Sequence, residues 1–269
     1  MLLGCPAPEG DGTDTAPRTS SSPAPAQADA KVAPPVTVWA DPLLKPLLTG
    51  IGDKFSEHYP GGYSVEYLET SELLATFSDG APAMLPGVFL FCGNELLRSL
   101  SEAGLANETT ARVFAGDSLA LVQQAGEGFA TPSLFDIYTL RFKSLVIAPE
   151  GTTSGLYARQ ALIADNVMPR VEDRLAVAED TLDLLEMVAT GEMLLGITPV
   201  SAIAGFSGIE VVMLIGEDLH KDIQYSAVAS ATESPGQLEL LMFLSEDEAI
   251  QELVPGYGFT DMETALVED

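Results

Sequence analysis

The chain is poor in positive charge. Its 269 residues hold 12 Lys and Arg against 40 Asp and Glu, a formal net charge of -28 at pH 7. A protein this acidic repels phosphate backbones, so we do not expect nucleic acid as a partner. A solvated surface suited to solubility or to a salty habitat would carry the same excess of acid. The charge therefore excludes one class of partner without indicating a cation site.

Cysteine is scarce, and long apolar runs are missing. The two cysteines, Cys5 and Cys92, argue against a disulfide framework and against a thiolate metal site. Cys92 follows the apolar run GVFLF and is expected to be a small buried hydrophobe. No run approaches the ~20 apolar residues of a membrane-spanning helix. The hydrophobic content of 46% is that of a globular protein.

The first 35 residues are predicted to be a tether. LLGC at residues 2–5 resembles the bacterial lipobox, in which the cysteine is acylated after cleavage, but only four residues precede Cys5. Either the first Met lies inside a longer gene, or the match is chance. Residues 6–35 are rich in Pro, Ala, Ser and Thr, the composition of a flexible tether. We expect a lipoprotein anchored through Cys5 in the periplasm or cell envelope.

From Val36 onward, short apolar strands alternate with helical patterns, which is typical of an α/β protein with parallel sheets. Asp41 is a natural helix N-cap, and Pro42 suits the first helical position. The predicted strands are 36–40, 63–69, 87–91, 118–123, 143–148, 174–178, 194–197, 209–215 and 223–230. The predicted helices are 43–58, 70–77, 94–104, 155–166 and 181–190, a short one to about 204, and two near the end.

Several predicted helix starts are rich in hydroxyl groups or acid. They are Asp41-Pro42, Thr70-Ser71, 152–155 and Asp180-Thr181. A helix start offers free N–H groups and a partial positive charge, so it binds anions without Lys or Arg. Ligands of open parallel sheets lie at this end of the strands. Each start alone is an ordinary cap, but their succession favours a binding site.

Motifs of enzymes are missing from the sequence. We find no nucleotide-binding, zinc-protease or serine-hydrolase motif, no nucleophile–base pair and no metal-ligand cluster. We therefore predict no enzymatic activity, no metal centre and no cofactor. His58 and His220 lack ligand spacing and are expected at the surface.

A succession of segments resembles the molybdate-binding protein family of bacterial ABC importers. The similarity covers residues 36–260 and is most specific in GAPA (80–83), GLYARQAL (155–162), VATGE (188–192) and the terminal PGYGF. It implies the fold of a type II periplasmic binding protein, an α/β fold of two lobes. Each lobe would be a mostly parallel sheet flanked by helices, with two crossover strands. Lobe 1 would hold 36–117 and 228–269, and lobe 2 would hold 118–227.

The resemblance also implies an oxyanion cleft, with changes. The family's first serine falls on Pro42, which has neither N–H nor hydroxyl. Asp41, if it caps that helix, would place a carboxylate where the anion should lie. The family's tyrosine falls on Pro199, so another donor is lost. The family's second hydroxyl falls on Thr70-Ser71, and its two backbone N–H donors fall on Ser154 and Thr181. The predicted ligand-binding set is therefore Asp41, Thr70, Ser71, Ser154, Thr181 and Pro199.

The function implied by the resemblance is that of a non-enzymatic solute-binding component of an ABC importer. It would hold a tetrahedral oxyanion such as molybdate or tungstate through hydroxyl and N–H donors. We expect a monomer whose partners are the permease and ATPase subunits and which touches the membrane only through a lipid anchor. The lost donors leave two alternatives: a repurposed clamp for a metal cation, chelate or small polar organic solute, or a ligand-free sensory or interaction protein. The segment 123–142 could be a lid or a surface excursion.

Overall fold

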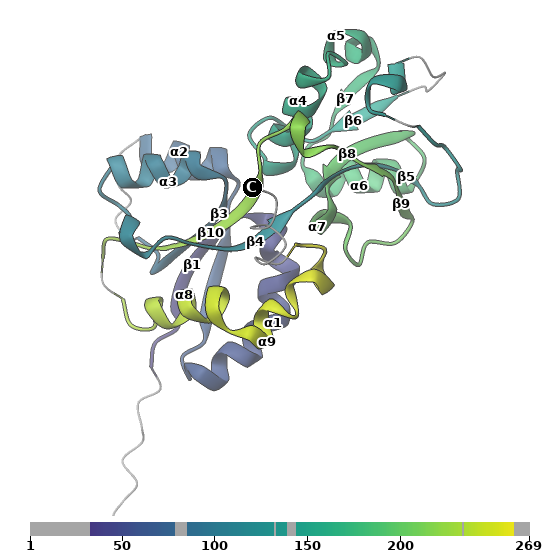
Figure 1. Ribbon diagram of the computed structural model, residues 1–269. Helices are drawn as coiled ribbons and strands as arrows, with labels where there is room; N and C mark the ends of the chain where they lie inside the picture. The colour runs from purple at the N-terminus through teal and green to yellow at the C-terminus, as the bar shows by residue number, and fades with distance from the viewer. Residues whose placement is uncertain (1–32, 79–84, 132, 139–143, 233, 261–269) are drawn as a thin grey trace, which may run out of the picture. The chain divides into compact units, whose positions relative to one another are not determined.

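A computed structural model of the protein describes residues 33–78, 85–131, 133–138, 144–232 and 234–260. Two five-stranded sheets, both within one compact unit from Ala33 to Asp269, organise these residues (Figure 1). Residues 6–32 of the predicted tether lie outside the described residues, as do the lipobox-like Cys5, the GAPA motif and parts of 123–142. Among the described residues, no helix is both long enough and apolar enough to cross a membrane.

The first sheet has the strand order β2-β1-β3-β10-β4. Its strands are β1 (Val36–Ala40), β2 (Tyr63–Tyr67), β3 (Val88–Cys92), β4 (Arg112–Asp117) and β10 (Ile223–Ala229). The helices that accompany it are α1 (Lys45–His58), α2 (Thr70–Ser78), α3 (Asn94–Glu102), α8 (Gln237–Glu246) and α9 (Glu248–Gln251). Three 3-10 turns, η1 (Pro42–Leu44), η2 (Glu108–Thr110) and η6 (Val254–Tyr257), complete this part.

The second sheet repeats the plan in the order β7-β6-β8-β5-β9. Its strands are β5 (Leu119–Gln124), β6 (Leu145–Ile147), β7 (Leu175–Val177), β8 (Leu195–Pro199) and β9 (Ile209–Leu214). Its helices are α4 (Thr153–Ala164), α5 (Met168–Val171), α6 (Thr181–Ala189) and α7 (Val200–Ile203). The 3-10 turns here are η3 (Phe135–Tyr138), η4 (Glu172–Arg174) and η5 (Glu217–Leu219).

The chain passes between the sheets twice, and each passage reverses one strand. Only Ser118 separates β4 of the first sheet from β5 of the second, and β10 returns to the first sheet after β9. β10 is antiparallel to β3 and β4, and β5 is antiparallel to β8 and β9. The remaining strands of each sheet share one direction, so the sheets are mixed but mostly parallel. This is the two-lobed α/β fold expected from the sequence, while the lobe limits at 117/118 and 227/228 stay a prediction.

The hydrophobic core explains why β3 reads as an unbroken apolar run. All five of its residues are buried because helices cover both faces of its sheet. Leu90 packs in the cluster that contains Phe55 of α1, whereas Phe89 and Phe91 pack in the cluster of Leu96 from α3. Complete burial of one such side chain stabilises the fold by about 1.5–3 kcal/mol.

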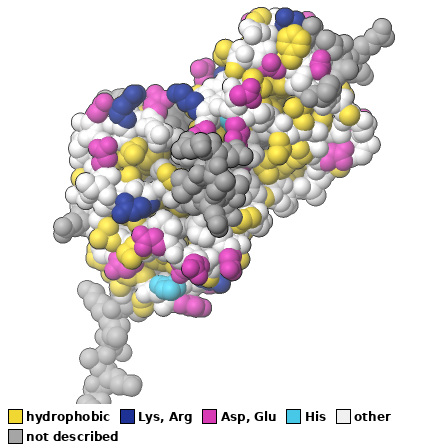
Figure 2. Space-filling model, viewed as in Figure 1, with side chains coloured by type: hydrophobic (Ala, Val, Ile, Leu, Met, Phe, Trp, Pro, Cys, Tyr) yellow, Lys and Arg dark blue, Asp and Glu magenta, His cyan; other side chains and the backbone are white. Residues whose placement is uncertain are grey.

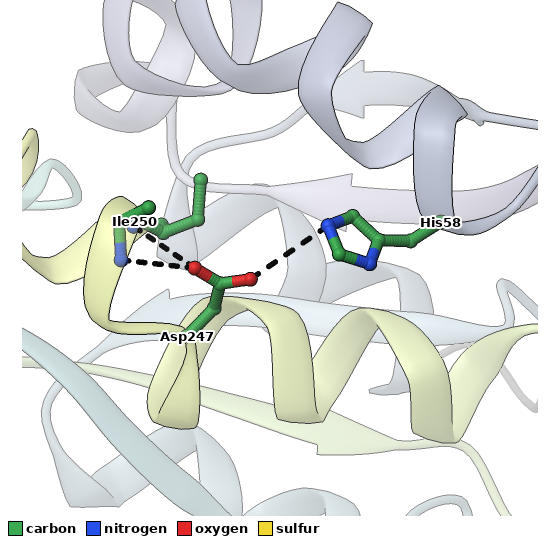
Figure 3. A network of polar contacts seen from close by, with 4 residues as sticks. His58, Asp247 and Ile250 are labelled. Carbon is green, nitrogen blue, oxygen red and sulfur yellow. Dashed lines mark hydrogen bonds and ion pairs between the residues drawn. The ribbon is translucent and has the colours of Figure 1, made fainter.

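The exposed surface agrees with the composition. Acidic side chains are spread over the face shown in Figure 2, between scattered hydrophobic and basic ones. Some acids have structural tasks. Asp247 caps α9, since its Oδ1 accepts hydrogen bonds from the N–H groups of Ala249 (3.0 Å) and Ile250 (3.3 Å). Its Oδ2 lies 3.7 Å from Nε2 of the exposed His58 (Figure 3).

Candidate functional site

The carboxyl end of β1 carries a buried carboxylate. Asp41 is 1% exposed, and its N–H donates to the Leu90 carbonyl at 2.9 Å. Its Oδ1 accepts the Leu43 N–H at 2.9 Å, so Asp41 caps the helix start at Pro42 as predicted. Its Oδ2 accepts a hydrogen bond from the Thr153 hydroxyl, which belongs to the helix after β6. Asp41 therefore joins a residue 112 positions away in the chain.

The start of α4 supplies the hydroxyl groups that face Asp41. Thr152 caps this helix by accepting the Gly155 N–H at 3.0 Å. Thr153 and Ser154 follow, with 3% and 0% exposure. The Ser154 hydroxyl lies 3.0 Å from the hydroxyl of Thr198, which is fully buried on β8. Two hydroxyls share one hydrogen bond there, so one proton of the pair remains for another acceptor.

Glycine at position 155 is required by the close approach of two chain segments. A Cβ atom there would lie 1.9 Å from the Pro149 carbonyl oxygen and 2.4 Å from that of Ala148. No side chain fits at such distances. The Gly in TSGLYARQAL thus lets the loop after β6 fold tightly onto the first turn of α4, which places Thr153 and Ser154.

The other predicted site residues have different surroundings. Ser71, in the first turn of α2, donates its N–H to the Gly151 carbonyl at 3.3 Å, so α2 begins next to the loop before α4. Thr70 is half-buried beside it. Thr181 is also half-buried and begins α6, which Asp180 caps through the Asp183 N–H at 2.8 Å.

Pro199 ends β8 and is buried. It follows Thr198 directly, and the next N–H, that of Val200, donates to the Ser118 carbonyl at 2.8 Å. The first backbone N–H of α7 is therefore bonded to Ser118, the residue that links β4 and β5. Sequence analysis named Pro199 and passed over Thr198, although a hydroxyl at the end of a buried strand is a signal for such a site.

The electrostatics of the site are dominated by carboxyl groups. Burial raises the pKa of Asp41, against the opposing effects of the Thr153 hydroxyl and the Leu43 N–H. Desolvation also raises the pKa of Glu69 to about 8, and the charges of Asp41, Glu72 and Asp180 add to the rise. These four acids do not form a metal cluster, since no described group of three or more Asp, Glu, His or Cys side chains could hold an ion.

Cys92 lies next to this site at the end of β3. It is free and 8% exposed, as expected for a small buried residue. Its Sγ lies 3.7 Å from the hydroxyl of Tyr157 on α4, and that hydroxyl also donates to the Asp222 carbonyl at 3.1 Å. Burial raises the pKa of the Cys92 thiol, and the charge of Asp41 adds to this. His220, expected at the surface, is half-buried because its ring packs edge-on against Tyr157.

Comparisons with known proteins place the chain in a family. A family model described as bacterial extracellular solute-binding protein matches residues 36–260. The chain is 26% identical over 231 residues to the molybdate-binding protein ModA of Haemophilus influenzae, covering 84% of this chain and 89% of that protein.

Two solved structures share the fold. The periplasmic molybdate-binding protein of Azotobacter vinelandii superimposes with a TM-score of 0.69 at 14% identity, covering 84% of this chain and 98% of its own. The sulfate-binding protein SubI from Mycobacterium tuberculosis H37Rv gives 0.70 at 16% identity, covering 86% and 88%. With the family model spanning nearly all described residues, the chain belongs to the bacterial extracellular solute-binding proteins.

Proposed function

We propose that this chain is the solute-binding component of an ABC importer and that it binds a small oxyanion where Asp41, Thr153, Ser154 and Thr198 meet. The observation that carries this proposal is a pair of contacts made by buried hydroxyls at the first turn of α4: Thr153 donates to Asp41, and Ser154 lies 3.0 Å from the Thr198 hydroxyl. Neutral donors and a helix N-terminus suit an anion that has lost its water shell. The relatives named for molybdate and sulfate support the same ligand class.

The proposed ligand has to compete with Asp41. The Thr153 hydroxyl has a single proton, and Asp41 accepts it. Two like charges about 4 Å apart repel by about 4 kcal/mol at an effective dielectric constant of 20. We therefore propose that an oxyanion binds best when Asp41 is neutral, and that it then takes over the proton of the Thr153 hydroxyl.

Calorimetric titration of the full chain with molybdate, tungstate, sulfate and phosphate tests the proposal. Binding of any of them should release or absorb heat and raise the unfolding midpoint by mass action. Ser154→Ala should weaken this binding, while Ser56→Ala, on the exposed side of α1, should leave it unchanged. Neither heat nor a midpoint shift with any of the four anions would contradict oxyanion binding.

A second candidate function is favoured by the acids around Glu69. The charges of Asp41, Glu72 and Asp180 act on Glu69, and such a group of acids would suit a small cationic organic solute better than a metal ion, since no described cluster is arranged to hold one. The variant Asp41→Ser separates the two. It should tighten oxyanion binding about tenfold or more under the first proposal, because the repulsion is removed. It should abolish cation binding under the second.

Asp53→Ser is the matched control for that variant, because it removes the same charge from the exposed face of α1. An equal effect of both variants would show that only the net charge matters. The partners would be the permease and ATPase subunits, and the place of action would be the periplasm or cell envelope, in line with the extracellular solute-binding family. Anchoring through Cys5 remains part of this proposal.

A further inference from the structure

One of the chain's three asparagines begins the tripeptide Asn107-Glu108-Thr109. Asn-X-Thr, with any residue except Pro in the middle, is the acceptor sequence for N-linked sugars in exported proteins. Asn94 and Asn166 lack a Ser or Thr two residues later. A tripeptide this short also arises by chance, so its surroundings in the fold have to decide whether it can be modified.

The surroundings of Asn107 leave its side chain accessible. Asn107 immediately precedes the 3-10 turn η2 and is exposed, as are Glu108 and Thr109. The backbone here is fixed: the Asn107 N–H donates to the Ala229 carbonyl at 2.9 Å, and the Thr110 hydroxyl accepts the Ala229 N–H at 3.0 Å. The acceptor residue is thus held at the surface of the folded chain.

The first and last side chains of the tripeptide contact each other. The Thr109 hydroxyl donates a hydrogen bond to Oδ1 of Asn107 at 2.8 Å. This bond uses the amide oxygen, so Nδ2, the atom to which an N-linked sugar is attached, takes no part in it. The exposed turn therefore presents the tripeptide with its reacting nitrogen outside the local hydrogen bond.

Asn107 lies at the edge of the first sheet opposite to the candidate oxyanion site. Its partner Ala229 ends β10 and pairs with Val88, the first residue of β3. β1 runs parallel to β3, and Asp41 follows the last residue of β1. Sugars on Asn107 would therefore sit at the far end of the strands and leave the oxyanion site unobstructed.

An apolar groove adjoins this turn. Leu238 and Met242, one turn apart on α8, are 52% and 57% exposed. They line a groove of about 190 Å³ together with Thr109 and Arg112. Exposed apolar side chains that share a groove mark a surface that another group can cover. Because Thr109 lies two residues from Asn107, a sugar chain on Asn107 is attached directly beside this groove.

We propose that Asn107 is an N-glycosylation site and that its sugars cover the groove between η2 and α8. In the modification, Nδ2 of Asn107 bonds to the anomeric carbon of a sugar carried by a lipid-linked phosphate. The bond from that carbon to the phosphate oxygen breaks, the lipid phosphate leaves with the electron pair, and one amide proton passes to a base of the membrane-bound transferase. The proposal rests on the export of the chain, as proposed above, and not on its ligand.

Mass spectrometry of the full chain, purified from the envelope of the cells that naturally produce it, tests the site. Trypsin cleaves after Arg98 and Arg112, so Asn107 is the only Asn of the peptide 99–112. This peptide should be heavier than its sequence by one or more sugar residues. The unmodified mass in exported protein would overturn the proposal while leaving export and oxyanion binding intact. A chain found only inside the cells would contradict both export and glycosylation.

Variants made in the same cells assign the added mass to Asn107. Asn107→Gln and Thr109→Ala should abolish it, because each destroys the acceptor sequence. Thr109→Ser keeps the hydroxyl and Glu108→Gln changes only an exposed neighbour, so both should retain the added mass. Added mass that persists in Asn107→Gln would place the sugar on a Ser or Thr of the peptide and refute this site.

The cover over the groove has a readout of its own. A fluorescent dye that binds exposed apolar surface should bind Asn107→Gln more strongly than the glycosylated protein. Glu108→Gln, which keeps the sugar, should bind the dye like the unaltered protein. Adding Leu238→Gln to Asn107→Gln should remove the gain, because it removes an apolar wall of the groove. Equal dye binding with and without the sugar would contradict the cover.

Discussion

β1 and β6 hold the same place in their two sheets, but the residues that follow them differ. Each strand lies between two parallel neighbours, β1 between β2 and β3 and β6 between β7 and β8. After β1 come Asp41 and Pro42, a carboxylate followed by a residue without N–H. After β6 the chain leads to Thr152, Thr153 and Ser154, three hydroxyl residues at the start of α4. In the hydrogen bond that joins them, the junction after β1 accepts through Asp41 and the junction after β6 donates through Thr153.

The comparison shows that topology and capping residue control different things. Parallel strands with short connections bring both helix starts to the same edge, so the two junctions meet at the Asp41–Thr153 hydrogen bond. The identity of the cap then sets the sign of the charge at that edge. A single substitution at Asp41 can therefore change which ligands the site accepts while the fold stays the same.

The largest effect is expected from a substitution at the start of α4, the junction that follows β6. Gly155→Ala would force a Cβ atom to 1.9 Å from the Pro149 carbonyl oxygen, so the loop and α4 have to separate. We expect a loss of about 3 kcal/mol or more in the free energy of unfolding, measured by urea denaturation. Gly256→Ala is the control, since no atom lies within 4 Å of its added Cβ. Similar losses in both variants would contradict the close approach.

Thr153→Val breaks the contact between the two junctions. It keeps the shape of the side chain and leaves Asp41 Oδ2 without its hydroxyl donor. We expect the free energy of unfolding to fall by about 1–3 kcal/mol at neutral pH. Thr109→Val, at an exposed threonine of η2, should change it by less than about 0.5 kcal/mol. A double-mutant cycle with Asp41→Asn should show coupling, and strict additivity would argue against a direct contact.

The pH dependence of stability tests the effect of the acidic residues near the junction after β1. The pKa of Glu69 rises from 4.5 to about 8 on folding, mainly through desolvation, so the folded state binds more protons between these values. Stability should therefore fall as the pH rises through this window. Glu69→Gln should flatten the slope, whereas Glu57→Gln, at an exposed position, should not. Urea denaturation across the window measures both, and an unchanged slope in Glu69→Gln would contradict the assignment.

The smallest effect is expected for the ion pair of Figure 3. His58 and Asp247 have side-chain exposures of 57% and 27%, so water screens their contact. His58→Ala should change the free energy of unfolding by less than about 0.5 kcal/mol, because a pair this exposed gains little from its charges. A loss of stability as large as that of Thr153→Val would contradict the expectation that the exposed ion pair contributes less than the buried hydrogen bond.

Strands and helices were largely predictable from the sequence because their signals are local. The run GVFLF appears as β3, Asp41 and Pro42 begin a helix, and Thr181 begins α6 after its Asp180 cap. The partners within the site were less predictable. Ser154 was expected at the ligand site, which stays a prediction, whereas its pairing with Thr198 and the contact of Thr153 with Asp41 were not foreseen. One residue along a helix rotates a side chain by about 100°, and sequence alone does not settle that angle.

By itself, the sequence determined the alternation of strands and helices, the glycine and proline positions that end them, and the acidic character of the chain. Tertiary structure alone decided which capping groups meet, because those contacts join residues far apart in the chain. Burial is the common physical reason: it raises the pKa of Asp41 and leaves its carboxylate to the Leu43 N–H and the Thr153 hydroxyl.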